Sequence, residues 1–162
     1  MLTNVIGSLS LIVWLPIAFG ILVLVFGGEG RERISKWLSP LGAVLGALVV
    51  IPLWLQFDRS EVAFQFVEFS PWVDTFNINY HLGIDGISLI LILLNVVTTI
   101  FVVVAGWEVI TKRVSHYHAA FLILSGMING VFCSLDAMLF YVFFEATPVS
   151  YTHLTLPTIL LV

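Results

Sequence analysis

The long apolar runs constrain this chain more than any other feature of its sequence. A membrane with a hydrocarbon core of about 30 Å is crossed by roughly 20 apolar residues in helical conformation. Four runs meet that length and a fifth begins but stops short; they are Val5–Phe26, Leu38–Phe57, Ile87–Trp107, Tyr117–Ser134 and Asp136–Thr147. With 60% hydrophobic and only 10% charged residues, the chain is predicted to be an all-α membrane protein with about five transmembrane helices.

The basic residues fall mainly on one side of this predicted array. Arg59 lies in the long connection Asp58–Asp85, and the other five lie in the connections after the first and third runs: Arg31, Arg33, Lys36, Lys112 and Arg113. Because basic connections stay in the cytoplasm, we expect a multi-pass protein whose N-terminus and Asp58–Asp85 face outward. No basic residue precedes the first run, which is therefore interpreted as a membrane anchor and not as a cleaved signal peptide.

The long outward connection carries a weaker pattern of its own. Its segments "VAFQFVEF" and "FNINYHL" partly alternate between apolar and polar residues, and Ser70-Pro71 interrupts the sequence between them. Alternation of this kind is typical of strands. We therefore expect two short strands, arranged as a hairpin that lies over the helices.

Glu145 is the ionisable residue that fits its apolar surroundings least. It lies nine residues beyond Asp136 in "LDAMLFYVFFEAT", which is roughly 14 Å along a helix and close to the middle of a hydrocarbon core. Acids at this depth are costly in lipid and usually functional. Two interpretations stay open: Glu145 carries a proton, or it is a structural acid bonded to a neighbouring helix.

The other polar residues near the spans have simpler explanations. Asp85 precedes the third run and Asp136 precedes the fifth, so both are interpreted as possible structural caps of helix N-termini. Four polar residues inside the spans are expected to bridge helices by hydrogen bonds; they are Asn95, Thr98, Thr99 and Asn129.

The histidines and the single cysteine point to no metal site. His116 and His118 are two residues apart, so they do not share a helix face, and we expect them in a solvated position at the membrane interface. Cys133 alone can form neither an internal disulfide nor a two-cysteine metal motif. The sequence has no basic stripe, so no nucleic-acid partner is expected.

Two stretches resemble a known family. "YHLGIDGISLILILLNVVTTI" and "LDAMLFYVFFEAT" are similar to the M-type proton-translocating membrane subunit of respiratory complex I, the NADH:quinone oxidoreductase. The resemblance implies an antiporter-like bundle of about fourteen transmembrane helices with inverted repeats, of which residues 1–147 would form the N-terminal part. It also implies that Glu145 transfers protons together with a buried lysine on the seventh helix, which has no counterpart in this sequence.

The resemblance also implies partners, cofactors and a location. The partners would be the lipid bilayer and other membrane subunits of complex I, in a bacterial inner membrane. NADH, quinone, FMN and the iron–sulfur clusters would belong to other subunits, with no cofactor in this chain. Two alternatives remain: a subunit of a multisubunit cation/proton antiporter, and a non-catalytic membrane scaffold.

Residues 148–162 depart from the family pattern. They read "PVSYTHLTLPTILLV", where the family continues with an apolar helix. Pro148 would break the helix just after Glu145, and the polar residues that follow it suit lipid poorly. We interpret this segment as an atypical tail, similar to a translated adapter and not native, and exclude it from the expected fold.

Overall fold

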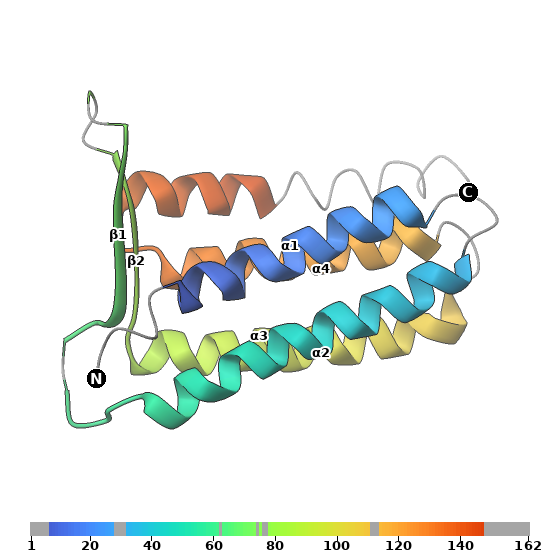
Figure 1. Cartoon of the computed structure of the whole chain (residues 1–162), viewed down its shortest axis with the longest axis horizontal. Helices are drawn as coiled ribbons and strands as arrows, with labels where there is room; N and C mark the ends of the chain where they lie inside the picture. The colour runs from blue at the N-terminus through green and yellow to red at the C-terminus, as the bar shows by residue number, and fades with distance from the viewer. Residues whose placement is uncertain are drawn as a thin grey trace.

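Five helices and one hairpin make up the described structure, which is a computed structural model (Figure 1). It describes residues 7–27, 32–61, 63–73, 75, 78–110 and 114–147. The long helices are α1 (Ser8–Phe26), α2 (Glu32–Gln56), α3 (Gly86–Val109) and α4 (Val114–Cys133), and a shorter apolar helix spans Ala137–Thr147. Four of them are long and apolar enough to cross a membrane. This confirms the mostly helical, multi-pass membrane class.

The helix boundaries differ from the expected ones where polar residues continue a helix. We expected the second helix from Leu38, but α2 begins at Glu32. Likewise, α4 begins at Val114 and not at Tyr117. Hydropathy locates only the part of a helix that suits lipid, whereas backbone hydrogen bonding continues beyond the hydrocarbon core.

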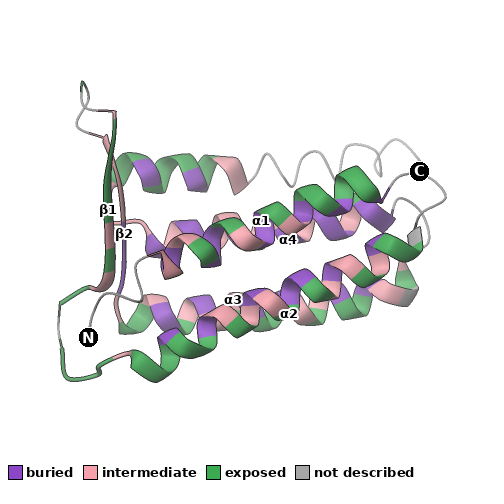
Figure 2. Ribbon diagram, viewed as in Figure 1, coloured by how far each residue is buried: buried purple, intermediate pink, exposed green. Residues whose placement is uncertain are grey.

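Small residues bring α1 and α4 together. A Cβ added at Gly126 of α4 would lie 2.6 Å from the carbonyl oxygen of Val13, and one added at Gly20 of α1 would lie 2.9 Å from that of Ala119. Contacts this close need glycine, and close approach of backbones is how helices associate in lipid. Figure 2 shows the buried residues between the helices and the exposed ones on the outside of the bundle. The four long helices therefore pack as one bundle.

A two-stranded antiparallel hairpin crosses one end of this bundle (Figure 1). Its strands are β1 (Gln65–Val73) and β2 (Ile78–Ile84), so the expected hairpin is confirmed. The expected break at Ser70-Pro71 is wrong, because these residues lie within β1 and pair with Tyr80 and Asn79. A two-stranded sheet leaves one side of every strand unpaired, and a proline without an N–H is tolerated there.

Glu68 of β1 fastens the hairpin to the start of α1. Its Oε1 accepts hydrogen bonds from the backbone N–H groups of Gly7 at 3.1 Å and Leu9 at 2.8 Å, and its Oε2 accepts from the Ser10 hydroxyl. The first N–H groups of a helix have no partner within the helix and attract negative charge. A carboxylate from the hairpin thus supplies the cap that α1 lacks in its own sequence.

An irregularity in β1 sets the direction in which the Glu68 carboxylate points. The pairing register shifts between Gln65 and Glu68, and Phe66, which lies between them, has a positive φ of 55°. Such bulges bend a strand and redirect the side chains beside them. The contact is extended by Tyr80 of β2, whose hydroxyl lies 3.0 Å from the Ser10 hydroxyl and accepts the indole N–H of Trp14 at 3.2 Å.

The hairpin also touches the start of the fifth helix. The Leu135 N–H donates to the His81 carbonyl at 2.9 Å, and the Asn79 N–H donates to Asp136 Oδ2 at 3.3 Å. Since β2 leads directly into α3 through Asp85, the hairpin connects the ends of four helices: α1, α3, α4 and Ala137–Thr147.

We predict that Glu68→Ala weakens this connection. The change leaves the first N–H groups of α1 without their acceptor, at an expected cost of order 1–3 kcal/mol in unfolding free energy. Thermal unfolding of the detergent-solubilised chain would measure the loss. Glu61→Ala, in the same connection but exposed, is the matched control. Equal melting temperatures for the two variants would contradict a role of Glu68 in holding the hairpin.

Candidate functional site

A polar network lies inside the bundle, between α3 and α4. The amide nitrogen Nδ2 of Asn95 donates to the Ser125 carbonyl at 2.9 Å and to Asn129 Oδ1 at 2.8 Å. The Thr99 hydroxyl lies 2.8 Å from the Ser125 hydroxyl. Three of the four predicted bridging residues, Asn95, Thr99 and Asn129, therefore do join helices. The prediction for Thr98 is wrong, because its exposed hydroxyl donates to the Leu94 carbonyl of its own helix.

Asn129 also supplies a hydrogen-bond donor that α1 lacks. Pro16 lies inside that helix and has no N–H to give to the carbonyl four residues before it. That carbonyl belongs to Ile12, and Asn129 Nδ2 donates to it at 3.3 Å. Ser125 was not predicted from the sequence, although it lies four residues before Asn129 and thus on the same helix face.

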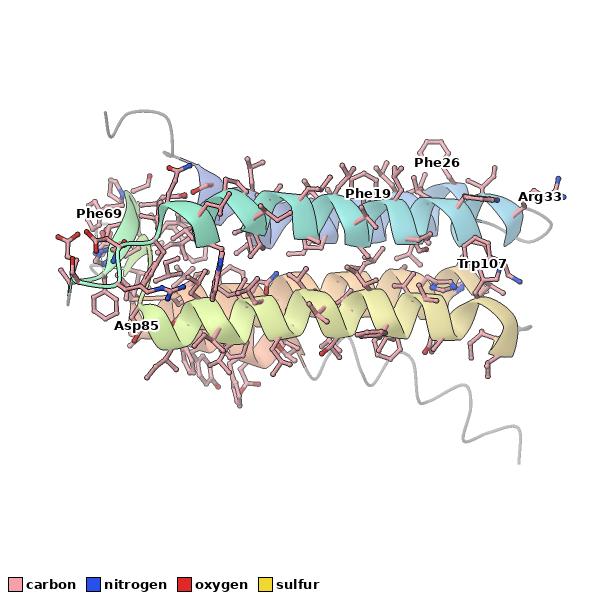
Figure 3. All side chains as sticks on the ribbon, turned by 90° about the horizontal axis from the view of Figure 1, so that it is seen from below. Phe19, Phe26, Arg33, Phe69, Asp85 and Trp107 are labelled. Carbon is pink, nitrogen blue, oxygen red and sulfur yellow. The ribbon has the colours of Figure 1, made fainter. Side chains whose placement is uncertain are left out.

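Asp85 and Asp136 both lie at helix N-termini. Asp85 is the N-cap of α3, and its Oδ1 accepts from the Ser88 N–H at 2.7 Å. Asp136 Oδ1 accepts from the Met138 N–H at 2.8 Å and the Leu139 N–H at 3.2 Å. The Ser88 N–H lowers the pKa of Asp85, and the Leu139 N–H lowers that of Asp136. Figure 3 shows Asp85 at the hairpin end of the molecule, with Phe69.

Glu145 lies near the far end of the fifth helix and points away from the bundle. Leu139 and Phe143 are the buried residues of that helix, and a Cβ added at Gly130 of α4 would lie 2.7 Å from the Phe143 ring. Glu145 is two residues beyond Phe143, hence on another face, and it is exposed. Within the described residues its side chain has no hydrogen bond or ion pair.

The histidine prediction is half wrong. His116 is exposed, as expected for a solvated interfacial residue, but His118 is fully buried. The structure differs because His118 lies on the face of α4 that packs against other helices, where its ring lies against Gly106 of α3. Among the described residues, no three His, Cys, Asp or Glu side chains are placed to hold a metal ion.

We predict that Asn129→Leu costs order 1–3 kcal/mol of stability, because the Ile12 carbonyl is then buried without a donor. Pro16→Ala gives that carbonyl an N–H of its own. In the Pro16→Ala background, Asn129→Leu should therefore cost clearly less. A double-mutant cycle from thermal unfolding measures this difference. If the two changes are simply additive, Asn129 does not compensate for Pro16.

We predict that the contribution of Asp85 to folding stability is lost at acid pH. Because the fold lowers its pKa below 3.8, the contribution of the carboxylate is present above that pH and disappears as the pH falls through the folded-state pKa. Asp85→Asn keeps a good cap and should remove this dependence, whereas Asp85→Ala should cost about 1 kcal/mol at neutral pH. Unfolding midpoints measured against pH test both; equal pH dependence in wild type and Asp85→Asn would contradict the assignment.

Comparison with known proteins identifies the family. The family model described as NADH-ubiquinone oxidoreductase chain 4, amino terminus, matches residues 44–135. The chain is 37% identical to NADH-ubiquinone oxidoreductase chain 4 of Arabidopsis thaliana over 139 residues, which is 86% of this chain and 28% of that protein. It is 38% identical to NADH-quinone oxidoreductase subunit M of Rhodobacter capsulatus over 141 residues, 85% of this chain and 27% of that protein. The chain therefore belongs to the chain 4/subunit M family, and it spans little more than a quarter of these relatives.

Proposed function

We propose that this member of the chain 4/subunit M family is the N-terminal part of a proton-translocating membrane subunit of NADH:quinone oxidoreductase, and that Glu145 carries protons in it. The observation that carries this proposal is the position of Glu145 on an apolar helix, on a face that α1–α4 leave uncovered. Because the chain covers only 28% of its relative from Arabidopsis thaliana, the activity of the complete subunit is inferred from the family.

The energetics of Glu145 support an interface with further protein. A charged acid facing lipid at mid-membrane costs several kcal/mol, and exposed apolar side chains surround it on the same helix, among them Tyr141 and Phe144. A helix packed over this face would remove the carboxylate from lipid and could bring a cation to it. The buried lysine that the family resemblance implies is such a cation.

The proposed mechanism uses two opposing effects on one carboxyl group. Removal from water favours its protonated form, and a nearby cation favours its ionised form. Movement of the cation toward or away from Glu145 would therefore release or take up one proton. The work required is set by the membrane potential, about 2.3 kcal/mol per charge for each 100 mV.

Redox chemistry is proposed to occur elsewhere in the assembly. Iron–sulfur clusters are held by several cysteine thiolates, and this chain has one cysteine, Cys133, which lies in the apolar core. We propose that other subunits bind NADH, FMN, quinone and the clusters. Other membrane subunits of the complex would be the direct protein partners, together with the lipid bilayer.

Residues 148–162 lie outside the described residues. We propose that residues 1–147 are the native N-terminal transmembrane part and that the remaining segment is not native. Sequencing of the locus tests this: an uninterrupted reading frame that retains "PVSYTHLT" would contradict it.

One observation distinguishes each of the two alternative functions from this proposal. A cation/proton antiporter subunit would also use a membrane acid, but the matched family and its named relatives are NADH oxidoreductase subunits. A passive scaffold needs no acid on an apolar helix. Both alternatives are therefore disfavoured relative to a coupling subunit.

We predict that Glu145→Gln, in the full-length subunit within its assembled complex, abolishes or sharply reduces proton pumping and the quinone reduction coupled to it. Glutamine keeps the size and hydrogen bonding of glutamate but cannot lose a proton. Glu145→Asp keeps the proton on a side chain one methylene shorter and should retain partial activity. Pumping and quinone reduction are measured in sealed membrane vesicles, with complex assembly checked in parallel.

Glu61→Gln is the matched control, since Glu61 is an exposed acid outside the helices. If Glu145 only bonds a neighbouring helix, glutamine should substitute well and alanine should impair assembly. Normal pumping in an assembled Glu145→Gln complex would exclude the proton-carrier role.

We predict further that the hairpin end of the bundle faces outward in a bacterial inner membrane. Five of the six basic residues lie in the sequence segments 27–37 and 108–118, away from the hairpin connection, which supports this orientation. In a Cys133→Ala background, Glu61→Cys should react with an impermeant thiol reagent added to intact cells, and His116→Cys should react only after the membrane is opened. Both side chains are exposed. The reverse pattern would invert the orientation.

A further inference from the structure

Two fully buried polar side chains lie without a partner at the end of the bundle opposite the hairpin. His118 of α4 and Ser35 of α2 are both 0% exposed. Both imidazole nitrogens of His118 and the Oγ of Ser35 lack a hydrogen-bond partner within the described part of the chain. Most buried polar atoms are bonded to protein or to ordered water, so these atoms require an explanation.

The two side chains belong to one polar region. A Cβ added at Gly27 would lie within 3 Å of both the Ser35 Oγ and the Ser115 Cβ, so the starts of α2 and α4 meet at the end of α1. Ser115 is three residues before His118 and therefore on the same face of α4. The His118 ring in turn contacts α3, where a Cβ added at Gly106 would lie 3.3 Å from its Cε1.

The titratable groups around the imidazole come from two elements. Lys36 of α2 lies near enough to act on His118 electrostatically. Tyr117 packs edge to face against its ring at 5.5 Å between centroids. These are the titratable groups that the structure places against His118 among the described side chains, and neither accepts or donates a hydrogen bond to it.

The position of these atoms near helix starts and their capacity for hydrogen bonds indicate that water is their partner. His118 is four residues into α4 and Ser35 three residues into α2, so both lie within about 6 Å of a helix start. Figure 3 shows Phe26, Arg33 and Trp107 at this same end. Buried water typically makes two to four hydrogen bonds to groups that are otherwise unsatisfied. An imidazole and a hydroxyl this close to the aqueous phase provide those bonds.

We propose that the ends of α1, α2, α3 and α4 enclose a water-binding site, built by Ser35, Ser115 and His118, through which the buried imidazole exchanges protons with the aqueous phase on the basic side of the membrane. Beyond His118 the same face of α4 continues with Leu122, which is fully buried and apolar. The site therefore ends one turn inside the bundle, separate from the internally bonded network at Asn95, Ser125 and Asn129. It is also independent of Glu145 and of the function proposed for it.

The first test compares two thiols in one molecule. Ser35→Cys places a thiol in the proposed site, while the native Cys133 is fully buried in the apolar core and serves as the internal reference. Only the thiolate reacts, and apolar burial suppresses it, so the thiol at position 35 should react with a small methanethiosulfonate at least about tenfold faster. The chain is labelled in lipid vesicles and read by peptide mass spectrometry. Equally slow reaction at both positions would show a dry site.

The second test measures the unchanged site and uses a variant only to assign the signals. Water-edited solid-state NMR on the wild-type chain, with histidine labelled with nitrogen-15, detects transfer of magnetisation from water to each imidazole. The spectrum of His118→Gln identifies the His118 signals by difference. We expect rapid transfer of magnetisation from water to the imidazole nitrogens of His118. Absence of this transfer would overturn the proposal, even if Ser35→Cys failed to fold.

Discussion

A membrane offers no water to an unpaired backbone group, and this constraint explains several polar side chains of the described structure. Every N–H and C=O in the hydrocarbon region must find its partner inside the protein. Pro16 withholds one N–H from α1, and Asn129 of α4 supplies a donor in its place. At the bundle end, Glu68 accepts the first N–H groups of α1 and Asp85 accepts one from α3. These polar residues pair with backbone groups that have no partner within their own helix, and they also connect one helix with another.

The same constraint explains why the sequence predicted so much of the fold. A helix is one of two structures that satisfy their own backbone in lipid, so each apolar run of sufficient length had one reasonable conformation. The hairpin lies outside the bilayer, where alternation is a weaker signal, and the error at Ser70-Pro71 occurred there. Proline was interpreted as a break, although an unpaired strand side accommodates it.

The sequence suffices to propose Glu145 as the site residue, but it does not give the geometry around it. The depth of Glu145 follows from a count of residues, and the face on which it lies follows only from the packing of Phe143 against Gly130. For His118, the environment predicted from the sequence was wrong. We expected this residue in a solvated position, but its helix face packs against α3 at Gly106, and only the tertiary structure shows this. Glu68 was missed because its partner, the start of α1, is far away in the sequence.

Different interactions hold the helices together at the two ends of the bundle, so the two ends differ mechanically. At the hairpin end, hydrogen bonds through main-chain groups connect α1, α4 and the fifth helix to the strands. At the other end, the described residues hold together by side-chain packing, such as the edge-to-face pair of Trp37 and Trp107 at 5.4 Å. We therefore expect small tilts of the helices to pivot at the strands. Over a helix of about 30 Å, a tilt of a few degrees displaces the far end by about 2–3 Å, roughly the diameter of a water molecule.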